Sequence, residues 1–465
     1  MVHAAADRIA AATLGTPFEG KVWLVGGAVR DDLLGRPAAA DIDLVVEGDA
    51  PALAHLLWDK RVSRTKPSIY ANFGTAKIEV DRASVELVTA RRESYRGDSR
   101  KPAVEPASLR QDARRRDFTV NALLRNIHTG EVADPLGKGL ADLEAGILRT
   151  PLDPIRTFTE DPLRMLRAVR FKWTLGFAFA PEIEPAVARC ASRVAKLSPE
   201  RIQEEWNRML DLPAGADAFG DMMRLGLIAP IAPEMAAMVG VDQGAYHHLD
   251  VWEHSLLVMR NIGCGDRVAS LAALLHDIGK PPTRSVDPDG RVRFFGHETV
   301  GSALAATVLR RLRYPSDVVE SVACLVKAHM RLGTAEKWTP SASRRLIRDM
   351  GDNLERLLRL VEADASALRP GMRVLNLGPL RDQIARALVE TPRETLESPL
   401  SGSAIMSELG IEPGPEVGAA KSWLRERVLE GDLSPNDAEG ARRMLRERYR
   451  RRGAEAPDED SGPGG

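Results

Sequence analysis

Apolar residues follow two different periods along this chain, and the change between them divides it. In the N-terminal third, short apolar runs rich in β-branched residues occur at residues 22–25, 44–46 and 85–88. Runs of this length that end at glycine or polar residues predict β-strands. Beyond about residue 150 the apolar positions follow a helical spacing, as over residues 161–171. We therefore expect an α+β fold, with a small mixed sheet and helices followed by an all-helical remainder.

Local signals place several boundaries. Ser198 before Pro199 indicates a helix N-cap with proline at the first helical position. Residues 96–106 are polar and contain proline, which predicts a flexible loop, and the last ten residues have the composition of a disordered tail. A chain of 465 residues is too long for one ordinary domain. We divide it into domains at residues 1–148, 149–215, 216–380 and 381–465.

The composition narrows the class of protein. Hydrophobic residues make up 44%, ample for buried cores, and the net charge of -1 gives no global sign of nucleic-acid binding. Any RNA-binding surface must come from local basic clusters, although a solvated helix face explains the last of them equally well. The clusters are Arg91, Arg92, Arg96, Arg100 and Lys101, then Arg110 and Arg114 to Arg116, then Arg442, Arg443, Arg446, Arg448 and Arg450 to Arg452.

The cysteines and the N-terminus bear on location. Cys190, Cys264 and Cys324 are far apart, odd in number and lack C-x-x-C spacing. This argues against a disulfide framework or a cysteine zinc site and suits a reducing compartment. The N-terminus has no basic segment before an apolar core, and no stretch approaches the ~20 apolar residues of a membrane span. We expect a soluble, cytoplasmic protein with no membrane association.

The first candidate site joins a glycine turn to paired carboxylates. Gly26 and Gly27 end the strand at residues 22–25, and glycines let a backbone turn approach a phosphate. Asp41 and Asp43 are two apart, so on a strand both side chains point to one face. Such a pair favours Mg²⁺, and two-metal phosphoryl transfer uses it to activate a hydroxyl and hold a triphosphate. Without the glycine segment, a solvated pair at a strand edge would explain the pattern equally well.

A third carboxylate usually completes such a site. Glu86 interrupts the apolar strand at residues 85–88, where an acid is otherwise unfavourable. Asp81 is the competitor, and we favour Glu86.

A segment that mixes charged and core residues follows at residues 115–122, and we call it the strip. It begins with Arg115, Arg116 and Asp117, followed by Phe118. A purely structural interpretation of the strip is a helix start, with Asp117 as the cap and Phe118 and Leu123 packed inward. A binding role is compatible with that structure, because anchored arginines bind phosphate and ribose well.

These segments resemble the bacterial-type (class II) tRNA nucleotidyltransferases, the CCA-adding enzymes and their poly(A) polymerase relatives in the DNA polymerase beta superfamily. The resemblance rests on residues 26–31, 41–43, 112–122 and 160–164, which occur in order over roughly residues 20–205. It implies that Asp41 and Asp43 bind catalytic Mg²⁺. The residues expected to bind the nucleotide are Gly26, Gly27, Arg30, Asp112, Arg115, Arg116, Asp117, Asn121, Asp161 and Arg164. Ala113 stands where the family commonly has leucine, which we expect to change packing and not chemistry.

The resemblance also implies that Asp161 and Arg164 read the incoming base. Residues three apart on a helix share a face. Aspartate accepts from an exocyclic amine and arginine donates to a ring nitrogen or carbonyl, and only cytosine and adenine present an amine beside an acceptor. One pair of side chains would then select CTP and ATP without a nucleic-acid template. Without the other motifs, a surface ion pair would be the default interpretation.

The second candidate site is a cluster of histidines. The chain has nine histidines, and most lie within one third of it. His254, His276, Asp277 and Asp364 fall in predicted helices, with the His-Asp pair at the end of the apolar run 271–275. Imidazole and carboxylate donors suit Mn, Fe, Ni, Co or Zn, and Mg if few nitrogens bind. A divalent ion in such a centre activates water for phosphoester hydrolysis.

Residues 252–255, 275–280 and 295–298 resemble the HD-domain phosphohydrolases. The resemblance implies four core metal ligands and a second metal position completed by two more histidines. These are His254, His276, Asp277 and Asp364, with His297 and His329 at the second position. Glu362 is the competitor of Asp364. Residues 399–402 and 410–414 are similar to a C-terminal pattern of HD-bearing CCA enzymes.

Together the resemblances imply a bifunctional RNA-processing enzyme. A nucleotidyltransferase head (1–148) would add C, C and A to tRNA 3′ ends from CTP and ATP with release of pyrophosphate. A neck (149–215) would select the base and bind tRNA, and an HD domain (216–380) would hydrolyse phosphoesters. The expected ions are Mg²⁺ at the transferase site and Ni²⁺, Mn²⁺, Co²⁺ or Mg²⁺ at the HD site.

Three alternatives stay open at this point. The enzyme could add only CC, only A or a poly(A) tail. It could be a signalling enzyme that uridylylates a protein, which would be expected to lack the strip at residues 115–122. It could be a phosphohydrolase whose head only binds RNA, against which Asp41 and Asp43 argue. The oligomeric state, monomer or homodimer, also stays open.

Overall fold

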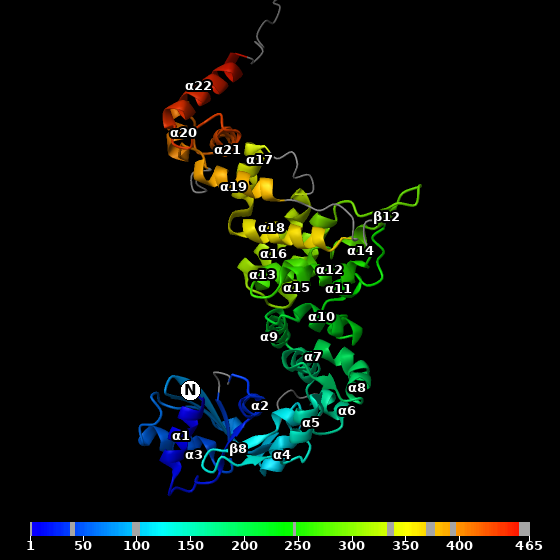
Figure 1. Ribbon diagram of the computed structural model, residues 1–465. Coiled ribbons are helices and arrows are strands. Elements are labelled where there is room, and N and C mark those ends of the chain that lie inside the picture. Colours follow the sequence, from blue (N-terminus) through cyan, green and yellow to red (C-terminus); the bar gives the residue numbers. More distant parts are fainter. Residues whose placement is uncertain are drawn as a thin grey trace, which may run out of the picture. The chain divides into compact units, whose positions relative to one another are not determined.

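The chain forms two compact units, Met1–Ala236 and Ala237–Gly465. The structure is a computed structural model that describes residues 2–37, 42–94, 103–244, 248–332, 339–368, 377–390 and 397–454 (Figure 1). Each unit contains its own buried apolar clusters. The four finer domains stay predictions, and the predicted disordered tail lies outside the described residues.

The first unit is built on a seven-stranded sheet with the order β3-β4-β5-β2-β1-β8-β9. Strands β2 and β5 are parallel, and the other neighbours in this sheet are antiparallel. The predicted strands at residues 22–25, 44–46 and 85–88 are confirmed. The strands are β1 Val22–Val25, β2 Ile42–Val46, β3 Ser68–Tyr70, β4 Thr75–Val80, β5 Ala83–Thr89, β8 Leu124–Asn126 and β9 Val132–Ala133.

Helices α1 (Val2–Thr13) and α3 (Ala50–Asp59) supply apolar side chains to the main core on one face of this sheet. Helix α3 begins where it does because the side chain of Asp49 accepts a hydrogen bond from Ala52 N and Pro51 occupies the first turn. The opposite face carries a smaller cluster around Val25 and Val45. Polar residues of the sheet therefore gather on that second face.

The predicted flexible loop at residues 96–106 is partly wrong. Ala103–Pro106 forms strand β7, paired antiparallel with β6 (Arg91–Ser94). The backbone hydrogen bonds supplied by β6 override the polar composition that suggested a loop, and Pro106 is tolerated at the end of the strand. Residues 96–102 lie outside the described part of the chain.

Helices follow the sheet, as expected. The head contains α2 Gly27–Leu33, η1 Ala71–Phe73, α4 Leu109–Arg114, η2 Thr119–Asn121 and α5 Gly139–Ala145, and a small parallel pair, β10 Ile147–Leu148 with β11 Ala178–Phe179. The remaining helices of the unit are α6 Pro154–Glu160, α7 Leu163–Leu175, α8 Ile183–Cys190, η3 Ala191–Lys196, α9 Pro199–Leu210, α10 Gly215–Arg224 and α11 Pro233–Ala236. Ser198 is the N-cap residue of α9 and Pro199 its first residue, as predicted.

The helix predicted from Asp161 begins later. Helix α7 begins at Leu163, and Asp161 has an extended backbone (φ -138°, ψ 100°) between α6 and α7. The cause is Pro162, which disfavours a helical conformation for the residue before it and donates no backbone hydrogen bond. The Asp161 carboxylate instead accepts from Leu163 N at 3.1 Å, at the start of the new helix.

The second unit is helical apart from one short hairpin in its described part. Its elements are α12 Val251–Ile262, α13 Arg267–Leu275, α14 Lys280–Thr283, β12 Ser285–Val286, β13 Val292–Arg293, α15 His297–Arg311, α16 Ser316–Ala328, η4 His329–Leu332, α17 Pro340–Met350, η6 Gly351–Asn353, α18 Leu354–Ser366, α19 Gly378–Glu390, α20 Gly402–Leu409, α21 Pro415–Glu430 and α22 Ala438–Ala454. Helices α20 to α22 share a separate apolar cluster. The α+β fold class is confirmed. None of the helices in the described ranges is long and apolar enough to cross a bilayer.

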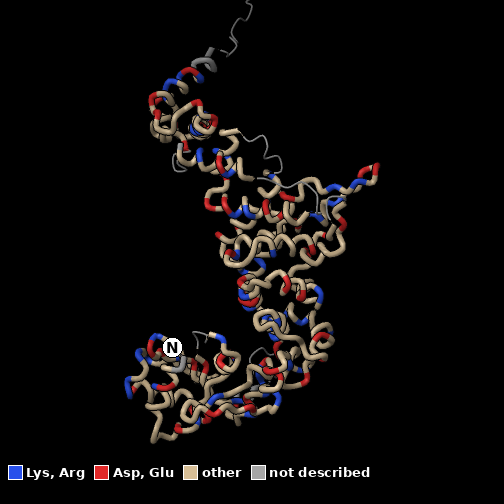
Figure 2. The backbone as a smooth tube through the Cα atoms, viewed as in Figure 1, with Lys and Arg blue, Asp and Glu red and all other residues tan. Residues whose placement is uncertain are grey.

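Basic and acidic residues are interspersed along the backbone of both units (Figure 2). In the described part of the C-terminal cluster, Arg442 and Arg446 both pair with Glu408. The Arg448 guanidinium lies 4.6 Å from the centroid of the Trp423 ring. These contacts favour the interpretation of these arginines as a solvated, ion-paired helix face.

Two candidate catalytic sites

Two carboxylates stand side by side on neighbouring parallel strands of the sheet. Asp43 of β2 is in register with Glu86 of β5. Both side chains project from the face opposite the main core, because the residues on either side of each are buried on the other face. Asp41, two residues before Asp43, lies outside the described residues. Of the acidic pair that the sequence predicts, Asp43 therefore lies next to Glu86, and the position of Asp41 stays a prediction.

The electrostatics favour Glu86 over Asp81 as the additional carboxylate. Loss of hydration raises the pKa of Glu86, and the negative charge of Asp43 raises it further. A cation held by both carboxylates would relieve this repulsion. Asp81 instead lies in the turn between β4 and β5, with φ 50°, where it pairs with Arg8. The role of Glu86 stays a prediction.

The glycine turn at Gly26 and Gly27 lies beside the Asp43 carboxylate in space. Gly26 has φ 75° and ψ -138°, a conformation that favours glycine. A Cβ at this position would lie 3.9 Å from Asp43 Oδ2 and 4.0 Å from Arg116 Nη1. In the helix that follows, the buried Arg30 donates from Nη1 to Asn121 Oδ1 at 2.6 Å. The turn, the carboxylates and the strip therefore meet at one place.

Asp112 is a buried anchor for two arginines of the strip. Its carboxylate accepts from Arg115 Nε at 2.8 Å and from Arg116 Nη2 at 3.0 Å. Burial raises the pKa of Asp112, but the charges of Arg116 and Arg115 outweigh burial and lower it. Both guanidiniums are therefore positioned by an ionised carboxylate. Ala113 is buried beside it, in keeping with a packing role.

Asp117 lies at the centre of a second network. Its Oδ1 accepts from Phe118 N at 2.8 Å and Asn121 Nδ2 at 3.0 Å, and its Oδ2 accepts from Arg167 Nε and Nη2 at 2.9 and 2.6 Å. Burial raises the pKa of Asp117, but Arg167 and Asn121 lower it to about 2. The inward packing of Phe118 and Leu123 is confirmed. The expectation that Asp117 caps a helix is wrong, because Phe118 precedes η2 without a side-chain cap.

Arg167 belongs to a cluster that the sequence did not reveal. Arg167 and Arg170 of α7 both face Glu205 of α9, at 3.7 and 2.6 Å. The guanidiniums of Arg30, Arg167 and Arg170 lie 5.2, 5.2 and 4.2 Å from the centroid of the Phe171 ring. The available signal was Glu205 itself, an acid on the apolar face of an amphipathic helix. The cluster ties the strip to helices α7 and α9.

Replacing Arg167 by methionine tests this network. We expect the variant to lose about 3 kcal/mol of stability at pH 7, because a buried carboxylate loses its partner. Since Arg167 helps to depress the pKa of Asp117 from 3.8 to about 2, its contribution is present above pH 3.8 and is lost as the pH falls through 2. The difference between variant and wild type in the free energy of unfolding, measured with a chemical denaturant, should therefore shrink as the pH falls from 3.8 to about 2.

The matched control is Arg156→Met, which removes an exposed pair with Glu160. We expect this control to change stability by no more than about 1 kcal/mol. Equal losses in the two variants at pH 7 would contradict the assignment of Arg167 as the partner of a buried charge.

Asp161 and Arg164 lie beside the strip, but not on one helix face as the sequence suggested. Arg164 is buried in the first turn of α7 and donates from Nη2 to the carbonyl oxygen of Arg115. Asp161 precedes the helix and accepts from Arg201 Nη2 of α9 at 2.9 Å. The break at Pro162 explains the difference. Two different parts of the fold therefore position the candidate base-reading side chains.

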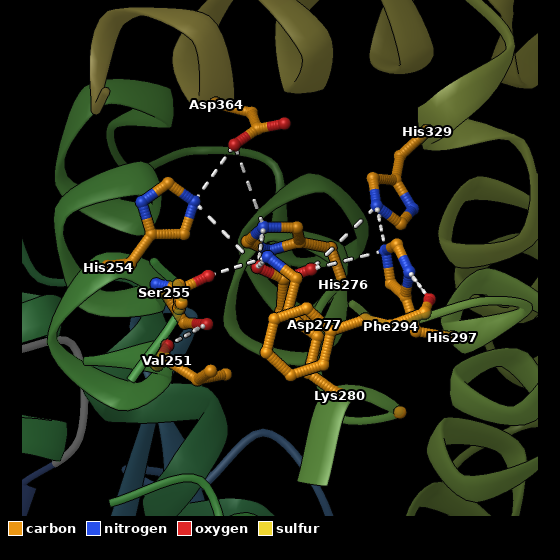
Figure 3. Close-up of polar contacts among 12 residues, drawn as sticks. Val251, His254, Ser255, His276, Asp277, Lys280, Phe294, His297, His329 and Asp364 are labelled. Carbon is orange, nitrogen blue, oxygen red and sulfur yellow. Dashed lines mark hydrogen bonds and ion pairs between the residues drawn. The ribbon is translucent and has the colours of Figure 1, made fainter. Parts of the chain in front are cut away.

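The second site brings together four histidines and two aspartates from separate elements (Figure 3). Two groups of potential metal ligands share Asp277, with ligand atoms within 4.8 Å of one another. One group is His254, His276 and Asp277, and the other is Asp277, His297 and His329. Asp277 Oδ2 lies 3.1 Å from His276 Nε2, and Oδ1 lies 3.6 Å from His297 Nε2. Asp277 can therefore bridge two cation positions.

Asp364 of α18 lies beside the first group. Its Oδ1 lies 2.9 Å from His254 Nε2 and 3.8 Å from His276 Nε2. The competitor Glu362 instead pairs with Arg381 at 3.0 Å. His276 is the C-cap residue of α13, so the expected position of the His-Asp pair at the end of the apolar helix is confirmed.

The histidine tautomers fit a metal site. The Nδ1 atoms of His276, His297 and His329 donate to the backbone carbonyls of Ala273, Phe294 and Val326, at 2.8, 2.8 and 2.6 Å. When neutral, each ring therefore presents a bare Nε2 to the site. Two such atoms, in His297 and His329, lie 3.3 Å apart, and the buried His276 Nε2 lies 3.1 Å from Asp277 Oδ2. A divalent cation between these nitrogens and the Asp277 carboxylate would satisfy them.

Burial and charge shape the protonation of this site. Burial lowers the pKa of His276, but the neighbouring carboxylate of Asp277 outweighs burial and raises it. Burial, and then the charge of His276, lower the pKa of His329 to about 4. At neutral pH the His329 ring is therefore uncharged.

A buried lysine pairs with the Asp277 carboxylate. Lys280 Nζ donates to Asp277 Oδ2 and to Gln243 Oε1, both at 2.6 Å. Gly279 allows the His-Asp segment to approach the first turn of helix α15, because a Cβ there would lie 2.1 Å from the carbonyl oxygen of His297. Sequence reasoning did not assign a role to Gln243 or Lys280.

Three family models match the chain in order. A poly A polymerase head domain covers residues 22–149, and a probable RNA and SrmB-binding site of polymerase A covers residues 176–239. An HD domain covers residues 244–366. Together with the two sites, these matches define a polymerase-type nucleotidyltransferase head joined to an HD domain.

Relatives that match most of the chain identify the family. An A-adding tRNA nucleotidyltransferase of Deinococcus radiodurans is 34% identical over 442 residues, 91% of this chain and 95% of the relative. A CC-adding tRNA nucleotidyltransferase of Thermus thermophilus is 36% identical over 429 residues, 89% and 91% of the two chains. The CCA-adding enzyme of Bacillus stearothermophilus, solved with CTP, matches with a TM-score of 0.71 at 25% identity over 97% of this chain and 99% of that one. The chain belongs to the family of tRNA nucleotidyltransferases and poly(A) polymerases.

Proposed function

We propose that this protein adds C, C and A to the 3′ ends of tRNA, using CTP and ATP and releasing pyrophosphate. The observation that carries the proposal is the meeting of Asp43, Glu86, the Gly26 turn and the Arg115–Arg116 strip at one face of the sheet. The names of the three relatives support tRNA as the acceptor and CTP and ATP as donors.

Different residues of the head would bind the metal, the phosphates and the ribose. Asp41 and Asp43, with Glu86, would supply oxygen ligands for Mg²⁺, and the ion would activate the RNA 3′-hydroxyl and stabilise charge on the triphosphate. Backbone N–H groups of the turn at Gly26 and Gly27 face the phosphates. The two guanidiniums fixed by Asp112 bind phosphate and ribose, and Asn121 is held in place by Asp117.

Base selection falls to Asp161 and Arg164. The aspartate accepts from the exocyclic amine of cytosine or adenine, and the arginine donates to the acceptor beside it. Uracil and guanine present the reverse pattern at this edge. The protein itself would therefore replace a nucleic-acid template.

The main alternative is addition of part of the CCA sequence. Relatives of nearly the full length of this chain are named A-adding and CC-adding, so partial addition and poly(A) addition are the outcomes that the assay must separate. A protein-uridylylating enzyme is disfavoured by the ordered strip with Asp112 and Asp117. A head that only binds RNA is disfavoured by the pairing of Asp43 with Glu86.

We propose a metal-dependent phosphohydrolase activity for the second site. His254, His276, Asp277 and Asp364 would hold one divalent ion, and Asp277, His297 and His329 a second, with Ni²⁺, Mn²⁺, Co²⁺ or Mg²⁺ as candidates. A bound ion would supply activated water for attack on a phosphoester. The proposed substrates are 2′,3′-cyclic phosphate or 2′-phosphate groups on damaged RNA ends or small nucleotides. The proposed location of the protein is the cytoplasm.

The transferase proposal is tested by pyrophosphate release. We expect Mg²⁺-dependent release from CTP and ATP only when a tRNA that lacks its 3′ CCA is present. Release without tRNA, or no release with it, would contradict the proposal.

A further inference from the structure

The Asp161 carboxylate connects the start of helix α7 to helix α9. Its Oδ1 accepts from Leu163 N at 3.1 Å, and its Oδ2 accepts from Arg201 Nη2 at 2.9 Å. Arg201 lies in the first turn of α9. It is therefore part neither of the head nor of the connection between α6 and α7 that contains Asp161. A carboxylate oxygen has two lone pairs, so each oxygen can accept a further hydrogen bond without losing these partners.

The neighbouring Arg164 is held differently. Its guanidinium donates to the carbonyl oxygen of Arg115, within the strip, and lies 4.0 Å from Glu160. The head thus positions Arg164, whereas the side chain that reaches Asp161 from another helix is Arg201. Asp161 is thus held by the backbone of Leu163 and by the Arg201 side chain, and Arg164 by the backbone of Arg115.

We propose that Arg201 is a positioning residue that sets base selection, by fixing the orientation of the Asp161 carboxylate. This inference rests on the proposed function. A fixed carboxylate oxygen accepts from the amine of cytosine or adenine and repels the carbonyl oxygen that uracil or guanine presents at the same place. A carboxylate free to turn can move away from that carbonyl, so the wrong base is penalised less.

A purely structural role for Arg201 predicts a different result. The Arg201 side chain is 47% exposed and that of Asp161 24%, and ion pairs with this much exposure contribute little to stability. A structural role would alter activity with all four nucleotides together. A positioning role alters the ratio between right and wrong nucleotides.

The test is the ratio of kcat/KM for CTP to that for UTP, and for ATP to that for GTP, with tRNA that lacks its 3′ CCA. In Arg201→Gln we expect this ratio to fall roughly tenfold, in the range that one misplaced hydrogen-bonding group gives. Arg201→Lys, which keeps the charge without the planar fork, should recover part of the ratio. The control is Arg208→Gln on the same helix, which is 49% exposed and pairs with Glu204, and its ratio should match wild type.

The outcomes separate this inference from the function on which it rests. An unchanged ratio in an active Arg201→Gln, or an equal loss for CTP and UTP, would overturn the role of Arg201 and leave the proposed function standing. A wild-type protein that incorporates neither CTP nor ATP would overturn both. A fall in the CTP-to-UTP and ATP-to-GTP ratios that occurs only in the Arg201 variants, with an unaltered thermal unfolding midpoint, would support the inference.

Discussion

Replacing Asp43 by asparagine is expected to lower nucleotide addition by roughly a thousandfold or more, because the neutral amide no longer supports the metal that stabilises charge in phosphoryl transfer. The side chain is exposed on the sheet face beside Glu86, so the variant should fold normally. The measurement is the rate of labelled CTP incorporation into tRNA, together with the thermal unfolding midpoint.

Two further variants identify the additional carboxylate. Glu86→Gln should also lose most of its activity, since Glu86 is in register with Asp43 on the next strand. Asp81→Asn removes only the pair with Arg8 at the hairpin turn and should retain activity. The reverse pattern would assign the third carboxylate to Asp81, and full activity in Asp43→Asn would refute the site.

Replacing Asp277 by asparagine is expected to remove phosphohydrolase activity, again by roughly a thousandfold or more. The reason is that its two oxygens face different histidines, Oδ2 toward His276 and Oδ1 toward His297, so both cation positions lose a ligand. The measurement is hydrolysis of bis(p-nitrophenyl) phosphate with added Ni²⁺ or Mn²⁺, alongside the metal content per chain. Nucleotide addition should be unchanged.

A second variant separates the two metal positions. His329→Ala should lower metal content less than Asp277→Asn, because His329 belongs to only one of the groups. The control is Asp287→Asn, which loses an exposed pair with Arg293 in the β12–β13 hairpin and should behave as wild type. Equal metal content in wild type and Asp277→Asn would show that Asp277 is not a ligand.

Much of the fold could be predicted because local patterns agree with the final packing. The strand at residues 22–25 and the proline-started helix at Pro199 are governed by periodicity and capping, which act within a few residues. The His276-Asp277 pair could be placed because the apolar run before it forms a buried helix. These features need no information about distant segments.

The failures come from contacts between distant segments. Ala103–Pro106 is a strand only because β6 pairs with it. Arg167 and Arg201 look like ordinary surface residues in the sequence, and only the packing of α7 and α9 near the strip brings them to Asp117 and Asp161. Pro162 is the exception, because its local effect on Asp161 could have been read in advance.

The most direct test of the central claim is to sequence the products made from a tRNA lacking its 3′ CCA, with Mg²⁺ and CTP, ATP or both. The account predicts C and C with CTP alone and the complete CCA when both nucleotides are present. Addition of only C residues, only A or a long A tail would contradict complete CCA addition and keep the transferase. The absence of any addition would contradict the transferase itself.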